Sequence, residues 1–168
     1  MNIDGIIDNA IRMEEEGYDF YKKAEARTSS RFGKLMFASL AEDEVKHKRL
    51  LEGVKKKMPA DARELDVPLP KEKLRSVFAD AKAHMNEKVA STADDTAALA
   101  FAMTKETESH DLYKSAARDS ADPKVRAVFE RMAIEENHHY EILEQTKYFL
   151  EQNSNWSIWE EGGPIEGG

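Results

Sequence analysis

An internal repeat constrains the fold of this chain more than any other feature of its sequence. When the sequence is shifted by 92 residues, positions 10–52 align without a gap with positions 102–144, and thirteen of the 43 aligned positions are identical. Apolar residues recur every three or four residues in both segments, which is the spacing of amphipathic helices rather than strands. The sequence therefore predicts two copies of one helical hairpin, with repeat halves at about 3–57 and 92–149.

Two such hairpins can bury their apolar faces by packing against each other, which gives an all-α four-helix bundle. The connector between the halves, residues 58–91, holds three of the five prolines and is far longer than a bundle turn of ~2–8 residues. We therefore expect one long crossover connection. The bundle is expected to span residues 1–153, followed by an acidic tail with tryptophan and glycine at 154–168.

Composition argues against several other kinds of protein. The 168 residues carry 33 acidic and 25 basic side chains, and this net charge of −8 argues against a nucleic-acid-binding surface. Cysteine is absent, which excludes disulfides, thiolate nucleophiles and cysteine-ligated clusters within these residues. No apolar run approaches the ~18 residues of a membrane span, and the first residues do not resemble a signal peptide. We expect a cytoplasmic protein that binds neither nucleic acid nor membranes.

Charged and polar residues interrupt the apolar helix faces at repeat-related positions. Each predicted helix of the two hairpins places a glutamate on its apolar face, and the second helix of each hairpin adds a histidine one turn later. These residues are Glu14, Glu44, His47, Glu106, Glu136 and His139. Four buried carboxylates without counter-charges would have to be protonated. Two divalent cations would balance them, and carboxylate with imidazole suits iron, with manganese or zinc as substitutes. The pattern therefore predicts a two-metal site.

A second Glu-x-x-His pair overlaps the first in the last helix. The repeat and the apolar stripe both select Glu136 and His139 as the inward-facing pair. Glu135 and His138 share a side of the helix with Arg131, so we expect both of them to be exposed.

Two tyrosines also occupy repeat-related positions. Tyr21 and Tyr113 lie seven residues, or two helical turns, after Glu14 and Glu106, and thus on the same faces. Each could be a core tyrosine bonded to a nearby carboxylate. Each could also be a hydrogen-bond donor that orients a metal ligand or relays a proton, and both roles can hold at once.

These segments resemble the rubrerythrin branch of the ferritin-like di-iron carboxylate proteins. The resemblance rests on AIRMEEEGYDFYKKAEA, SLAEDEVKHKRLLE, AMTKETESHDLYKSAA and RMAIEENHHYEILE. It implies a ferritin-like bundle in which the six glutamates and histidines bind two iron ions, with Glu44 and Glu136 bridging them. It also implies an oxidoreductase that reduces hydrogen peroxide or dioxygen with electrons from ferrous iron.

Two features depart from the family pattern. Rubrerythrins carry a rubredoxin domain with four cysteines, whereas this chain has no cysteine, so a separate electron donor such as a rubredoxin-like protein is expected. Rubrerythrins also have an additional glutamate three residues after the ligand of the third bundle helix, where this chain has Ser109. The remaining ligands form the symmetric set of bacterioferritin-like centres.

Other functions also fit the sequence. The same oxidation could make the protein a ferroxidase that handles iron, although storage would require a large hollow assembly, whereas we expect a homodimer. A non-catalytic bundle could instead hold zinc or manganese as a structural metal and dock a partner. The tail contains Trp156 and Trp159. We expect their indoles to pack on the bundle or on a second subunit. Docking of the electron donor and disorder of the tail are the alternatives.

Overall fold

The structure, a computed structural model, describes residues 3–28, 31–57 and 93–151. Within these ranges the chain forms helices α1 (Ile3–Arg27), α2 (Arg31–Lys55), α4 (Ala93–Asp119) and α5 (Pro123–Glu151), and it contains no strand. The all-α class and the paired helices predicted from the repeat are confirmed. The predicted connector at 58–91 and the predicted tail at 154–168, with Trp156 and Trp159, lie outside the described residues.

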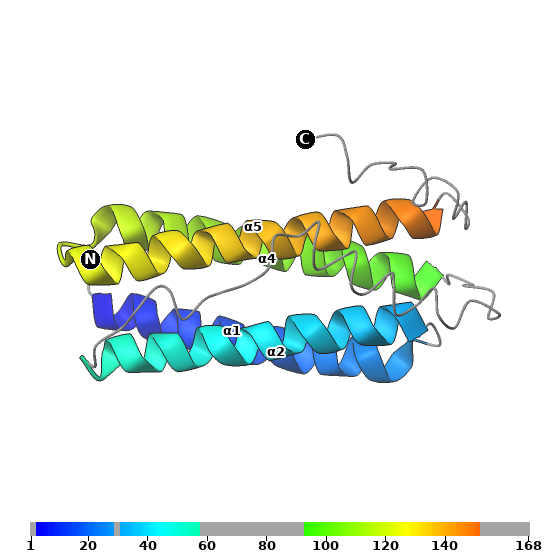
Figure 1. Ribbon diagram of the computed structural model, residues 1–168, viewed down its shortest axis with the longest axis horizontal. Helices are drawn as coiled ribbons and strands as arrows, with labels where there is room; N and C mark the ends of the chain where they lie inside the picture. Colours follow the sequence, from blue (N-terminus) through cyan, green and yellow to red (C-terminus); the bar gives the residue numbers. More distant parts are fainter. Residues whose placement is uncertain (1–2, 29–30, 58–92, 152–168) are drawn as a thin grey trace.

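The helices form an elongated bundle of two hairpins (Figure 1). The main packing joins α1 to α2 and α4 to α5, while the hairpins meet through α1 with α4 and through α2 with α5. Helix α2 ends at the end of the bundle where α1 begins, whereas α4 begins at the opposite end. The end of α2 and the start of α4 thus lie at opposite ends of the bundle, which is the placement that the predicted crossover connection requires.

Local sequence signals explain how each hairpin turns. Asp122 caps α5, because its side chain accepts a hydrogen bond of 2.8 Å from the backbone N–H of Lys124. Pro123 occupies the first position of the helix, where the missing N–H costs nothing. In the other hairpin, a Cβ at Gly33 would lie only 2.9 Å from Thr28 Oγ1, so glycine lets α2 approach the end of α1 closely.

The core consists of two apolar clusters separated along the bundle. One contains Tyr21, Phe37, Leu40, Leu99 and Leu143. The other contains Ile7, Leu51, Tyr113, Phe129 and Met132. On α2, Leu40 belongs to the first cluster and Leu51 to the second. Glu44 and His47 of the predicted site lie between these two leucines. Apolar packing therefore closes off the middle of the bundle from both of its ends.

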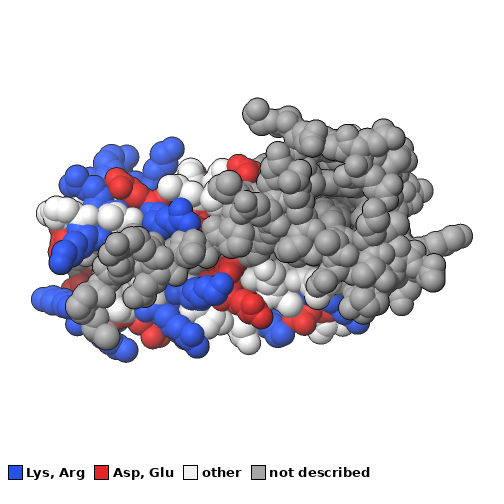
Figure 2. Space-filling model, viewed as in Figure 1, with Lys and Arg blue, Asp and Glu red and all other residues white. Residues whose placement is uncertain are grey.

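The outer surface is charged. Figure 2 shows Lys and Arg side chains interspersed with Asp and Glu over the described helices on the face that is drawn. Among the described helices, none has an apolar stretch long enough to cross a membrane.

Candidate metal centre

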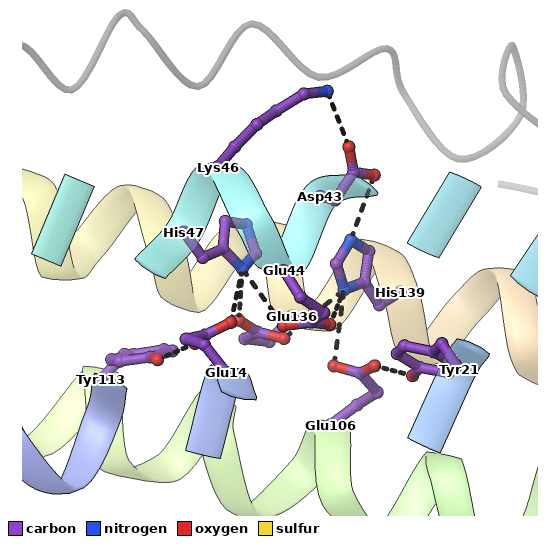
Figure 3. A network of polar contacts seen from close by, with 10 residues as sticks. All are labelled: Glu14, Tyr21, Asp43, Glu44, Lys46, His47, Glu106, Tyr113, Glu136 and His139. Carbon is purple, nitrogen blue, oxygen red and sulfur yellow. Dashed lines mark hydrogen bonds and ion pairs between the residues drawn. The ribbon is translucent and has the colours of Figure 1, made fainter. Parts of the chain in front are cut away.

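The six residues predicted to bind metal come together in the middle of the bundle (Figure 3). Helix α1 contributes one glutamate, α4 contributes one, and α2 and α5 each contribute a glutamate and a histidine: Glu14, Glu106, Glu44, His47, Glu136 and His139. None of the six is more than 4% exposed. Helical periodicity thus placed all six side chains on the buried faces, as the sequence indicated.

The six side chains form two overlapping groups. One group is Glu14, Glu44, His47 and Glu136, and the other is Glu44, Glu106, Glu136 and His139. Within each group, one ligand atom from every residue lies within 4.8 Å of the others. Glu44 and Glu136 belong to both groups. Two cations bound side by side could therefore share these two carboxylates.

Both histidines direct the same ring nitrogen toward the carboxylates. His47 Nδ1 lies 3.2 Å from Glu14 Oε2 and 3.1 Å from Glu136 Oε1. His139 Nδ1 lies 3.5 Å from Glu106 Oε2 and 3.5 Å from Glu136 Oε2. The two rings are nearly parallel, with centroids 5.4 Å apart and an interplanar angle of 22°. The cluster therefore presents two imidazole nitrogens to one shared set of oxygens.

Several buried polar atoms of the cluster lack a hydrogen-bond partner among the residues that the structure describes. Within the described part of the chain, His139 Nδ1 and Glu136 Oε1 are buried and have the ion-pair neighbours given above, but neither atom has a hydrogen-bond partner of normal geometry. Buried polar atoms in native proteins nearly always have a hydrogen-bond partner. Lone pairs that converge in a buried space with an oxygen and imidazole donor set suit metal ions such as iron. The residues present therefore fit metal ions.

Protons balance the charges of the cluster in the metal-free protein. Burial, together with the negative charge of Glu14, raises the pKa of Glu44 well above its usual range. Burial and the charges of Glu106 and Glu14 raise the pKa of Glu136 to about 7. These two carboxyl groups, which belong to both ligand groups, are therefore the ones that hold protons near neutral pH.

The histidines hold protons as well. Burial alone would lower their pKa values, but the facing carboxylates raise the pKa of His47 to about 10 and that of His139 to about 9. At pH 7 both imidazoles are therefore protonated when no metal is present. A cation that binds there has to displace these protons.

The two outer glutamates remain ionised. Burial favours the neutral form of Glu14, but its hydrogen bond with Glu44 and the charge of His47 hold its pKa below the usual value. Burial also favours the neutral form of Glu106. The charge of His139 and the hydrogen bond with Glu136 outweigh burial and lower the pKa of Glu106 to about 2. Negative charge in the metal-free cluster is thus concentrated at its two ends.

Each tyrosine donates a hydrogen bond across the interface between the hairpins. Tyr21 on α1 donates to Glu106 on α4, and Tyr113 on α4 donates to Glu14 on α1. Burial and the adjacent carboxylates raise the pKa of both phenols well above the ordinary value, so both remain neutral donors. Each phenol therefore holds the outer glutamate of the opposite hairpin.

Sequence reasoning did not identify Asp43 as part of this network. Its side chain is buried, with Oδ2 3.4 Å from His139 Nε2 and Oδ1 2.9 Å from Lys46 Nζ. His139 thus lies between Asp43 on one side and the glutamates on the other (Figure 3), which orients its ring. The available signal was the position of Asp43 directly before Glu44, but adjacency in sequence does not show which helix a side chain will reach.

The expectation that Glu135 is exposed is wrong. Glu135 is fully buried, and Arg131 Nη2, one turn earlier on α5, lies 2.6 Å from its Oε1. His138 is half-buried rather than exposed. The guanidinium supplies the counter-charge that lets a carboxylate leave water, and apolar periodicity does not reveal a buried ion pair.

The comparisons with known proteins agree with this geometry. The family model described as Rubrerythrin matches residues 5–147, a range that includes all six clustered glutamates and histidines and both tyrosines. Comparison with curated proteins and with solved structures gives no match. The family match extends over most of the chain, and we conclude that the chain belongs to the rubrerythrin family.

Proposed function

We propose that this protein is a non-haem di-iron oxidoreductase that reduces hydrogen peroxide or dioxygen. The observation that carries the proposal is the pair of buried ligand groups that share Glu44 and Glu136. We assign Glu14 and His47 to one iron, Glu106 and His139 to the other, and the two shared glutamates to both. Four carboxylates would balance the charge of two ferrous ions once the histidines are neutral.

The site chemistry follows from the number of metal ions. Two ferrous ions bound there would supply one electron each, which together are the two electrons needed to cleave one O–O bond. Reduction of one hydrogen peroxide to two water molecules also consumes two protons. Tyr21 is placed to pass protons, because its hydroxyl is bonded to Glu106 and its ring lines a cavity that opens at the surface.

The protein contributes position and shielding. Tyr21 and Tyr113 hold the two outer glutamates, and Asp43 orients the ring of His139. The apolar clusters on both sides limit the access of bulk water along the bundle. Because the chain contains no cysteine, we propose that a separate donor, such as a rubredoxin-like protein, returns the electrons.

Metal analysis followed by single-turnover kinetics tests the function. Protein from iron-replete cells should contain about two iron ions per chain, which is the number of ligand groups. After anaerobic reduction, one equivalent of hydrogen peroxide should oxidise both irons of a chain in a stopped-flow absorbance trace. Bound zinc or manganese with no oxidation would instead indicate a structural metal. Continued oxidation of added ferrous iron by dioxygen, with release of ferric iron, would indicate a ferroxidase.

A further inference from the structure

A cavity of about 380 Å³ lies between α1 and α4 and reaches the metal centre from the side. Its inner end is lined by Tyr21, Glu44 and Glu106, which belong to the centre or contact it. Its outer end is lined by Phe20 and Phe101 together with charged side chains of both helices. At ~30 Å³ per water molecule, this space has room for several small molecules.

Small residues keep the inner end of the cavity open. Gly17 and Ser109 both line it, and they occupy equivalent positions in the two repeats, one turn after Glu14 and Glu106. A Cβ at position 17 would lie 3.3 Å from Glu44 Cδ, so even alanine would press on that carboxyl group. A larger side chain at either position would occupy the space beside the centre.

The outer end of the cavity is aromatic on one side. The rings of Phe20 and Phe101 lie 5.1 Å apart, and Phe101 is 49% exposed. Lys105 lies over the Phe101 ring, 5.6 Å from its centroid. An apolar wall of this kind gives little favourable contact to a hydrated ion.

The acidic side chains at the outer end are paired with bases. Arg12 Nη1 lies 2.5 Å from Glu16 Oε1, and Lys105 Nζ lies 2.6 Å from Glu108 Oε2. A route that collects divalent cations requires carboxylates whose charge is not already compensated. Both glutamates that line this end are compensated, so the charges there do not favour a cation.

We propose that this cavity is the access route by which a small uncharged oxidant, hydrogen peroxide or dioxygen, reaches the centre, and that Gly17 and Ser109 keep the route open. The proposal rests on the proposed function, since it assumes iron at the centre. Beyond that function, it specifies the path of the oxidant, the absence of charge on the oxidant, and the two residues that set the width of the path.

Nitric oxide, an uncharged diatomic molecule that binds ferrous iron, serves as the probe. The full chain is loaded anaerobically with ferrous iron, and nitric oxide association is followed by stopped-flow absorbance in wild type, Gly17→Leu and Ser109→Leu. The matched control is Gly5→Leu, on the same helix as Gly17, where an added Cβ would have no atom within 4 Å. Both cavity variants should slow association about tenfold, equivalent to an added barrier of about 1.4 kcal/mol, while the control stays at the wild-type rate.

The rate of ferrous iron uptake by the metal-free protein is measured in parallel. Uptake should be unchanged in Ser109→Leu, because the proposed route does not carry ferrous ions. Gly17→Leu is not used for this comparison, since a Cβ at position 17 would lie 3.3 Å from Cδ of the shared ligand Glu44. Wild-type nitric oxide rates in both cavity variants would overturn the proposal. If nitric oxide association and iron uptake slowed equally, the route would also carry ferrous ions, and the claim that it serves uncharged molecules would be wrong. Failure of the wild type to bind two irons would refute the proposed function instead, so the two failures are distinguishable.

Discussion

The two hairpins of the bundle carry the same ligands, yet neither hairpin contains a complete site. Each ligand group takes three residues from one hairpin and a shared glutamate from the other: Glu136 completes the first group and Glu44 completes the second. The tyrosine hydrogen bonds also cross between the hairpins. A duplicated hairpin thus produced a site that exists only when both copies are docked.

The surroundings of the ligands differ between the two hairpins. Asp43 on α2 reaches His139 of the other hairpin, whereas Glu135, at the equivalent position of α5, is paired with Arg131 on its own helix. The repeat therefore conserves the ligands and not the network behind them. The two halves of the centre are therefore chemically distinct behind their shared ligands.

The largest effect is expected from the two shared glutamates. Glu44→Ala and Glu136→Ala each remove a ligand from both groups, so metal content should fall from about two ions per chain to one or fewer. Metal analysis after dialysis measures this change. Glu16→Ala is the control, because Glu16 is an exposed acidic residue on α1 and its loss should leave the content unchanged. Full occupancy in both alanine variants would contradict the ligand assignment.

A smaller effect should separate the two hairpins. Asp43→Asn removes the carboxylate beside His139 Nε2, and we expect metal affinity at that half of the centre to fall about 10–100-fold. Glu135→Gln should leave affinity within about threefold of wild type, because its described ion pair is with Arg131 rather than with a histidine. Competition with a chromophoric chelator measures both affinities. Equal losses would mean that the two positions act alike.

The tyrosine hydrogen bonds between the hairpins are expected to be equivalent. Tyr21→Phe and Tyr113→Phe each remove one buried hydrogen bond to an ionised glutamate, and each should lower the free energy of unfolding by about 1.5–3 kcal/mol. Urea denaturation of the metal-free variants measures the loss. Because the two bonds are related by the repeat, the two losses should be equal within about 0.5 kcal/mol. A loss of stability in only one of the two variants would show that the two hydrogen bonds are not equivalent.

The smallest effect concerns pH. The folded-state pKa values of His47, about 10, and His139, about 9, exceed the ordinary value of 6.5, so their contribution to metal-free stability is full below 6.5 and is lost as pH rises through 9–10. For Glu136 the contribution is full below 4.5 and is lost as pH rises through about 7. Metal-free stability should therefore fall above neutral pH.

Metal binding should show the opposite trend. Cations compete with these protons, so the increase in Tm produced by zinc should grow by several degrees between pH 6 and pH 8. Thermal denaturation with and without zinc, which undergoes no redox change, measures the increase at each pH. An increase that stays constant or shrinks would contradict the protonated state derived for the metal-free cluster.

The sequence alone determined the helices, their pairing into two hairpins and the six residues of the centre. These are local properties: a helix repeats every 3.6 residues, so the spacing of Glu44 and His47 from Leu40 and Leu51 already decides that all four share one face. The repeat then identified Glu106 and Glu136 by their alignment with the first hairpin.

How those faces meet depends on the packing of one hairpin against the other. That Tyr21 bonds to Glu106 and that Asp43 reaches His139 both depend on the register of one hairpin against the other. The cavity beside Gly17 depends on it as well. Periodicity within a helix specifies the direction of a side chain but not the residue opposite it, because that partner is set by packing between segments about 90 residues apart in the chain.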